Sequence, residues 1–227
     1  DVAAVAPRLM RDDSQIDSLG LGVFRNRRVI DRYAGASWFN LEKNFSSAVI
    51  SAFGVSGALA LYRRFALNSV CYFDGSIFDE TYHTYKEDVD LAFRLQSAGW
   101  RAAILLDTIA YHRRAAEAPP DLDDESAAQN KRQQPAAIRY YSYRNHLITL
   151  LKNEYWQNVI LDFPWIFWYE WKKFGWFLLF DRPSLRALGE IIERSLEIMA
   201  RRREITSKRK RSWREIRKLY SLQTTNQ

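Results

Sequence analysis

A change of character across residues 115–137 constrains the fold of this chain more than any other feature. The segment holds three of the six prolines, an acidic cluster at 121–125 and several alanines and glutamines. Prolines and clustered polar residues interrupt both helices and strands. We therefore expect a linker at 117–137, which separates a strand-containing region, 1–116, from a different region, 138–227.

Before this segment, short apolar runs alternate with helical patterns. The run at 2–10 ends in charged residues and is typical of a buried strand. Residues 87–98 repeat apolar side chains with helical spacing and precede Gly99, a residue type that commonly terminates helices. We also expect a loop at 25–44, a helix at 63–70, and strands at 48–53, 58–62, 101–106 and 108–112. This mixture predicts an α/β fold.

After the segment, the pattern becomes helical, with helices expected at 138–153, 156–180 and 185–218. Residues 155–180 contain twelve aromatic residues, including five of the eight tryptophans. Charged residues interrupt this stretch, so no uncharged run approaches the roughly 20 residues that span a bilayer. We predict that it is not a transmembrane helix.

The aromatic stretch is amphipathic when it is plotted as a helix. One face carries Ile160, Phe163, Pro164, Phe167, Trp171, Phe174 and Leu178, and the opposite face carries Asp162, Tyr169 and Lys173. Tryptophan and tyrosine favour the headgroup boundary of membranes. The pattern therefore predicts either a helix that lies in a membrane interface or a helix packed against the body or a partner.

The net charge of +7 is unevenly distributed. Residues 201–218 hold ten basic and two acidic residues, while the rest of the chain is close to neutral. A basic segment after an aromatic helix favours an anionic membrane surface. Nucleic-acid binding is the competing interpretation, but the segment lies near the chain end of a neutral body, so we predict no nucleic-acid partner. The single cysteine, Cys71, excludes an intrachain disulfide and fits a reducing compartment.

Three carboxylates open the expected helix at 87–98, in the sequence Glu87-Asp88-Val89-Asp90. Acidic residues stabilise helix N-termini by roughly 0.3–1 kcal/mol each, which is a purely structural role. An ionised carboxylate at such a place can also accept a proton from a substrate hydroxyl. Asp88 and Asp90 cannot point in one direction on a helix, so one would serve catalysis and the other structure.

Several short motifs occur together in a fixed order: Gly57-Ala58, Phe78-Asp79-Glu80, Glu87-Asp88-Val89-Asp90-Leu91, Arg94, Gly99 and Tyr111-His112. With this order and spacing, residues 1–155 resemble the second half of a family 2 glycosyltransferase of the GT-A fold. Tyr140-Tyr141 with Arg144-Asn145 resembles the helix after the catalytic core in its rhamnosyl- and galactofuranosyl-transferase-like members. The resemblance implies a partial GT-A sheet followed by a C-terminal amphipathic helical region.

The resemblance also implies inverting transfer of a sugar from a nucleotide-sugar donor to an acceptor hydroxyl. Asp88 matches the family's general base, and Glu87 and Asp90 would shape its site. Gly57 and Ala58 match the loop against which acceptor and donor sugar pack. Further residues match acceptor-side or charge-binding positions, and these are Asp79, Glu80 and Arg144.

The resemblance implies a divalent metal, Mg²⁺ or Mn²⁺, with His112 close to it. The alternative is that His112 has no metal and is a hydrogen-bonded histidine at the end of a strand. The family's DxD motif would lie in a front half that precedes Asp1. Asp121-Leu122-Asp123 spells DxD but falls in the expected linker, so we do not assign it to the metal. The expected acceptor is a lipid-linked or cell-surface glycan at the cytoplasmic face of the membrane. The alternative is a non-catalytic remnant or interaction module.

Overall fold

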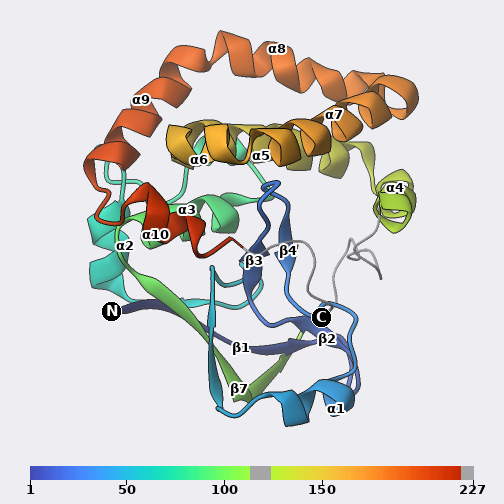
Figure 1. Cartoon of the computed structure of the whole chain (residues 1–227), viewed down its shortest axis with the longest axis vertical. Helices are drawn as coiled ribbons and strands as arrows, with labels where there is room; N and C mark the ends of the chain where they lie inside the picture. Colours follow the sequence, from blue (N-terminus) through green and yellow to red (C-terminus); the bar gives the residue numbers. More distant parts are fainter. Residues whose placement is uncertain (113–123, 221–227) are drawn as a thin grey trace.

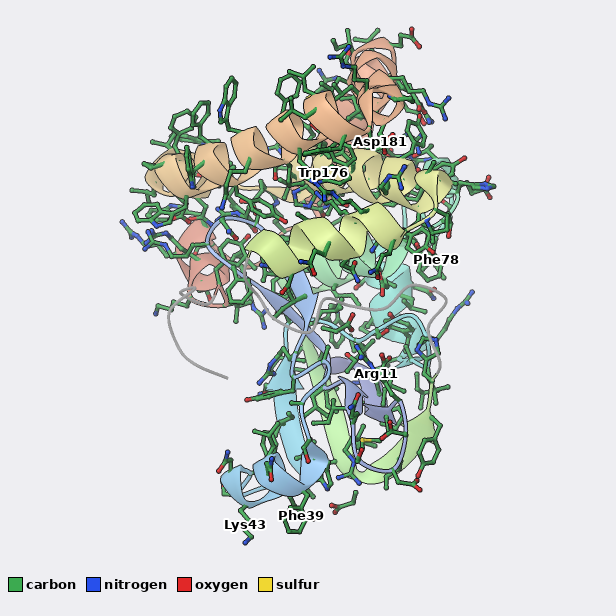
Figure 2. All side chains as sticks on the ribbon, turned by 90° about the vertical axis from the view of Figure 1, so that its right-hand side faces the viewer. Arg11, Phe39, Lys43, Phe78, Trp176 and Asp181 are labelled. Carbon is green, nitrogen blue, oxygen red and sulfur yellow. The ribbon has the colours of Figure 1, made fainter. Side chains whose placement is uncertain are left out.

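A computed structural model describes residues 1–112 and 124–220 of the chain. The sheet occupies one half of the molecule, together with the short helices of the first 70 residues, and the long helices of residues 136–207 form the other half (Figure 1). The mixed α/β class expected from the sequence is confirmed. Figure 2 shows Trp176 and Asp181 in the helical half and Phe39 and Lys43 at the opposite end, in and next to the short helix α1 (Trp38–Leu41).

The main sheet is built around two long parallel strands, β1 (Val2–Met10) and β7 (Arg101–Tyr111). β5 (Val49–Ala52) pairs antiparallel with β7, while β2 (Ile16–Ser18) and β6 (Leu61–Tyr62) pair antiparallel with opposite ends of β1. The order is β2-β1-β7-β5, with β6 also on β1. The register joins Ala4 to Ala102 and Met10 to Tyr111, with an irregularity after Pro7.

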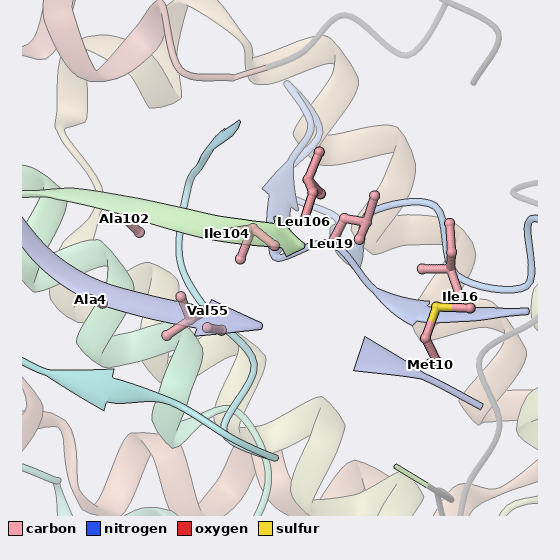
Figure 3. Close-up of a cluster of buried hydrophobic side chains, with 9 residues drawn as sticks. Ala4, Met10, Ile16, Leu19, Val55, Ala102, Ile104 and Leu106 are labelled. Atoms are coloured by element: carbon pink, nitrogen blue, oxygen red, sulfur yellow. The ribbon is translucent and has the colours of Figure 1, made fainter. Parts of the chain in front are cut away.

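Alternating small and branched side chains pack the sheet's core (Figure 3). Ala4 and Ala6 of β1 lie beside Ala102 and Ile104 of β7, all buried. The small residues let the covering segments approach closely, and burial of the larger ones stabilises the sheet by about 25 cal/mol per Å² of apolar area. Other members of this cluster include Met10, Ile16, Leu19, Val55 and Leu106.

α3 (Glu87–Ser97) packs against the sheet and α2 (Arg64–Val70). Gly54 allows this close approach, because a Cβ there would lie 2.4 Å from the Cβ of Ala92. Gly99 ends the helix region with a φ of +95°, the left-handed conformation that glycine adopts without strain. A 3₁₀ turn, η2 (Glu80–Tyr82), precedes α3.

The helical half begins with α4 (Asp124–Gln133) and α5 (Ala136–Asn153). It continues through α6 (Trp156–Leu161), α7 (Phe163–Phe180), η3 (Arg182–Leu185), α8 (Arg186–Glu193) and α9 (Ser195–Ser207). The short α10 (Trp213–Arg217) returns beside α3 (Figure 1). None of the described helices is long and apolar enough to cross a membrane, which confirms the prediction for 155–180.

A small hairpin joins the two halves. Its strands are β3 (Leu21–Val23) and β4 (Val29–Asp31), and its tip points toward the helices (Figure 1). Arg27 at the tip donates to Glu154 at 2.8 Å, and Arg25 donates to Asp162 at 2.8 Å. These ion pairs are buried or half-buried, so the hairpin fixes the helices onto the sheet.

Four expectations about the first two thirds of the chain were wrong. The expected linker is helical at Asp124–Gln133, because Ala, Glu, Gln and Lys are good helix formers; residues 113–123, including the Asp121-Leu122-Asp123 sequence, lie outside the described residues. The strand, turn and strand expected at 101–112 are one strand, β7. The expected loop at 25–44 contains β4, α1 and η1 (Glu42–Asn44), and only Leu61–Tyr62 of 58–62 form a strand.

The aromatic helix is divided at Asp162. The side chain of this residue accepts hydrogen bonds from Arg25, Arg27 and Arg217, which come from the hairpin and from α10. Three guanidinium groups around one carboxylate hold the chain at this place, and Pro164 at the start of α7 suits a new helix. The basic region expected as one helix at 185–218 is likewise divided into η3, α8, α9 and α10.

Candidate functional site

Asp88 lies in the first turn of α3, where backbone N–H groups are available to a carboxylate. Its Oδ2 accepts a hydrogen bond from the Gly57 N–H at 2.9 Å, and its Oδ1 accepts one from the Val89 N–H at 2.8 Å. The structure therefore brings together Gly57 and Asp88, which the sequence placed 31 residues apart.

The surroundings of Asp88 raise its pKa above the ordinary value. Burial is the largest cause, and the carboxylates of Glu87 and Asp31 add to it, while the Gly57 N–H acts in the opposite direction. A carboxylate with a raised pKa binds a proton more readily, so Asp88 has the character that a general base requires.

The turn at Gly57 and Ala58 is exposed and lies directly over this carboxylate. A Cβ at Gly57 would lie 3.4 Å from Oδ2 of Asp88, so the missing side chain leaves this approach open. Glu87 lies beside the same site, and its Oε2 is buried without a hydrogen-bond partner among the described residues. Burial and the nearby Asp88 also raise the pKa of Tyr62.

Asp90 points away from Asp88 into a buried ionic network, which we call the closed cluster: Asp79, Asp90, Arg94 and Lys152. Lys152 Nζ lies 2.7 Å from Asp79 Oδ2 and 3.1 Å from Asp90 Oδ1, and Arg94 Nε lies 2.9 Å from Asp90 Oδ2. Although burial disfavours its charge, Lys152 and Arg94 hold the pKa of Asp90 well below its usual range. Asp90 therefore fastens α3 to α5, and Asp79 fastens the start of η2 to α5.

Arg144 and Asn145 hold the loop that leads into α3. Asn145 Nδ2 donates to three carbonyl oxygens, those of Tyr82, Thr84 and Tyr85, at 2.7–2.9 Å. Arg144 Nη1 donates to the Thr81 carbonyl at 2.8 Å, and its Nη2 pairs with Glu190 at 2.6 Å. We assign Arg144 a positioning role, because its guanidinium is buried against this loop.

The clamped loop is strained. His83, Tyr85 and Lys86 have φ values of +59°, +66° and +70°, a region that side chains with a Cβ rarely occupy. Such strain persists where the surrounding contacts fix the backbone, and it concentrates at functional sites. Here the strained residues end immediately before Glu87 and Asp88. Glu80, earlier in the same loop, is exposed in the η2 turn.

His112 lies where β1 ends, since its N–H donates to the Met10 carbonyl at 2.8 Å. β6 runs antiparallel to β1, with Leu61 opposite Val5 and Tyr62 opposite Ala4, so the turn at Gly57, which precedes β6, lies toward the same end of β1. The side chain of His112 pairs there with Asp17 rather than with Asp88.

The chemistry of His112 fits one position in a metal site. Its Nδ1 lies 3.0 Å from Asp17 Oδ2, and a carboxylate on one ring nitrogen is the usual partner of a histidine that ligates through the other. Within residues 1–112 and 124–220, no group of three or more His, Cys, Asp or Glu residues is arranged to hold a metal ion. His112 could thus supply one metal ligand, and Asp17 would fix the orientation of its ring.

The face of α7 turned away from the body is an exposed aromatic surface. Its side chains are each between 42% and 73% exposed: Phe163, Phe167, Trp168, Trp171, Leu178 and Leu179. Phe163, Phe167 and Trp171 stack in a row with ring centroids 5.6 and 6.0 Å apart. The residues that the structure describes therefore leave most of the face that the sequence identified as apolar exposed. Contiguous apolar surfaces of this kind mark interaction sites.

Comparison with known proteins gives no family. No family model matches the chain, and neither the curated proteins nor the solved structures contain a significant match.

Sequence reasoning missed several residues near the site. Lys86 precedes Asp88 by two positions, and only its left-handed backbone distinguishes it. Lys152 lies 73 residues from its partner Asp79, a spacing that no local pattern reveals. For Lys173 a signal existed, since the helical plot placed it on the polar face, and the structure turns that face inward.

Proposed function

We propose that this chain carries the acceptor side of an inverting glycosyltransferase, with Asp88 as the general base. The observation that carries the proposal is the Asp88 carboxylate, held by the Gly57 N–H under an exposed turn with a raised pKa. The motif order from Gly57 to His112 supports the same assignment. The proposal places the nucleotide-binding part of the enzyme upstream of Asp1.

The proposed step is a single displacement. The acceptor hydroxyl gives its proton to Asp88, and its oxygen forms a bond to the anomeric carbon of the donor sugar. The bond from that carbon to the diphosphate breaks, and the electron pair leaves with the nucleoside diphosphate. A base within hydrogen-bond reach typically contributes 10²–10⁴-fold to such a reaction. Gly57 fixes the orientation of the carboxylate, and Arg144 and Asn145 fix the loop before it.

A divalent metal, when bound, would stabilise the negative charge that develops on the leaving diphosphate. In this proposal His112 holds it as one ligand, with Asp17 fixing the ring, and the DxD motif of the upstream part supplies the others.

The exposed aromatic surface of α7 supports peripheral attachment to the cytoplasmic face of a membrane, where a lipid-linked glycan acceptor would lie. The basic segment contributes less than its charge suggests. Arg201 pairs with Asp74 at 2.6 Å, Arg217 pairs with Asp162 at 2.7 Å, and Arg202 donates to backbone carbonyls of α5 and the residue after it. Membrane attachment in this proposal therefore rests mainly on aromatic side chains.

Substitution of Asp88 tests the catalytic proposal. In the complete gene product, we expect Asp88→Asn to reduce sugar transfer by at least 10²-fold while binding of the donor is retained. Asp107→Asn, an exposed carboxylate on β7, is the matched control and should keep full transfer. Undiminished transfer by folded Asp88→Asn protein would reject the base, and a complete gene product without transferase activity would favour an interaction module.

Vesicle flotation tests the membrane proposal. We expect the chain to float with phosphatidylcholine vesicles that carry phosphatidylglycerol, and the double variant Trp168→Ser/Trp171→Ser to lose most of this binding. Phe39→Ser, 76% exposed in α1 at the far end of the molecule, is the matched control (Figure 2). Equal flotation of the double variant and the wild type would reject the aromatic surface as the contact.

A further inference from the structure

A hollow of about 450 Å³, open to solvent, lies between α4, α5, α7 and the start of α3. It lies on the inward side of α7, opposite the exposed aromatic surface. Lysine side chains enter it from three separate elements: Lys86 before α3, Lys131 from α4 and Lys173 from α7. We call it the lysine cavity.

The positive charge of the lysine cavity is only partly balanced. Glu170 pairs with Lys173 at 3.1 Å and accepts from His146 at 2.7 Å, and Arg139 pairs with Asp181 at 2.6 Å. Among the residues that the structure describes, Lys86 and Lys131 form no ion pair with a carboxylate. Two ammonium groups therefore lack a carboxylate at ion-pair distance, although Glu170 attracts both from farther away and Asp88 and Asp31 attract Lys86.

Burial makes this excess charge unfavourable in the free protein. Burial, followed by repulsion from Lys173, lowers the pKa of Lys131 to about 7 and that of Lys86 to about 8. The same two causes lower the pKa of His146 to about 4, so this histidine stays neutral. Buried charges in proteins are normally paired, and an unpaired set in a cavity indicates a ligand of the opposite sign.

We propose that the lysine cavity binds a phosphate or diphosphate group. A phosphate monoester carries about −1.5 to −2 charge near pH 7 and has three strong acceptor oxygens, which matches two unpaired ammonium groups with three donors each. Ser142 lines the same cavity and adds a neutral hydroxyl donor. This inference concerns binding alone and does not depend on sugar transfer.

The phosphate group that binds in the lysine cavity belongs either to a soluble molecule or to the headgroup of a lipid. α7 links the cavity to the aromatic surface, since Lys173 and Tyr169 lie on its inner face and Trp168 and Trp171 are exposed on its outer face. A lipid phosphate at the cavity would therefore lie next to side chains suited to the membrane boundary. The phosphate chemistry is the same in both cases, and the experiment separates them.

Calorimetric titration of the 227-residue chain with sodium pyrophosphate and with inorganic phosphate tests the soluble source. Flotation with phosphatidylcholine vesicles that carry phosphatidic acid tests the lipid source, with phosphatidylglycerol vesicles as the phosphodiester reference. The test variant is Lys86→Met/Lys131→Met. The control is Lys43→Met, an exposed lysine at the far end of the molecule (Figure 2).

We expect saturable binding of at least one of these phosphates, weakened at least tenfold in the double variant and unchanged in Lys43→Met. Pair-dependent binding of pyrophosphate or phosphate identifies a soluble ligand, and pair-dependent preference for phosphatidic acid alone identifies a lipid headgroup. If no phosphate binds, or if binding ignores Lys86 and Lys131, the proposal fails. The single variant Lys131→Gln repeats the test should the double variant not fold, and circular dichroism checks each protein.

Discussion

The closed cluster and the lysine cavity both include side chains of α5, Lys152 in the first and Arg139 and His146 in the second, and they handle buried charge in opposite ways. In the closed cluster, two carboxylates face two cations, each within 3.1 Å of a partner. In the lysine cavity, Lys86 and Lys131 lack such partners among the described residues. A balanced buried set holds a structure together, whereas an unbalanced one leaves electrostatic attraction available for something outside the chain.

The difference shows in the pKa shifts. In the closed cluster, burial is outweighed by opposite charge, so the pKa of Asp90 falls and its ionised form is favoured. In the lysine cavity, burial and like charge act together, so the pKa values of Lys86 and Lys131 fall and their ionised forms are disfavoured. The following predictions test this contrast, from the largest expected effect to the smallest.

Removal of one partner should damage the closed cluster most. Lys152→Met leaves the buried carboxylate of Asp79 without its cation and leaves Asp90 with Arg94 alone, so we expect a loss of about 3–5 kcal/mol in the free energy of unfolding. Urea denaturation measures this change. Lys43→Met, at an exposed site, should change stability by less than about 0.5 kcal/mol. If Lys152→Met lowered the free energy of unfolding as little as the control does, the closed cluster would not stabilise the fold as we propose.

His146 should make stability depend on pH in the lysine cavity. Its folded pKa of about 4 lies below the ordinary 6.5, so the unfolded chain binds the proton more tightly. The contribution of neutral His146 to the free energy of unfolding is complete above pH 6.5. It is lost as the pH falls toward 4, and the loss is about 3 kcal/mol at most.

The matched measurement is the unfolding free energy of wild type and His146→Gln at pH 7 and at pH 4. We expect the wild type to lose more stability than the variant over this interval, because glutamine does not titrate. Parallel losses in the two proteins would show that His146 does not stay neutral in the folded state.

Substitution of an unpaired lysine should have the opposite sign from Lys152→Met. Lys86→Met removes a buried ammonium that lacks a carboxylate partner, so we expect the free energy of unfolding to rise by roughly 1–2 kcal/mol at pH 7. Denaturation in phosphate-free buffer measures it, because a bound anion would mask the gain. A destabilised variant under these conditions would show that Lys86 has a structural partner.

Asp88→Asn should change stability least. The raised pKa of Asp88 means that folding disfavours its charge, and asparagine can still accept the Gly57 N–H. We expect a rise in the free energy of unfolding of no more than about 1 kcal/mol. Thermal unfolding measures this change. A loss of 2 kcal/mol or more would place Asp88 with the structural carboxylates of the closed cluster.

Local patterns predicted the elements that depend on local causes. The apolar run of β1, the helical spacing of α3 and the stop at Gly99 follow from periodicity and from glycine's left-handed backbone. The division at Asp162 could not be predicted in this way, because its three arginine partners come from positions 55 to 137 residues away. The helix α4 was missed because the prolines around its region dominated the interpretation of a sequence rich in helix formers.

The residues of the candidate site also differ in how far local sequence patterns predicted them. Asp88 and Gly57 were identified from short motifs, and the structure joins them by one hydrogen bond. The sequence predicted that only one of Asp88 and Asp90 would serve catalysis, but it identified neither the buried partners of Asp90 nor the loop that Arg144 holds. Burial decided the roles of these two residues: Asp90 is enclosed by Arg94 and Lys152, and Arg144 is enclosed by the loop before α3.

The sequence by itself determined which residues share a strand or a helix face, including the placement of Lys173 and Tyr169 opposite the aromatic residues of α7. Only the tertiary structure decided which charges neutralise one another. A helical or strand period fixes direction over a few residues, whereas the energy of an ion pair depends on the separation of two atoms brought together by packing. For that reason Lys152 forms ion pairs with two carboxylates, whereas Lys86 and Lys131 form none with the described residues.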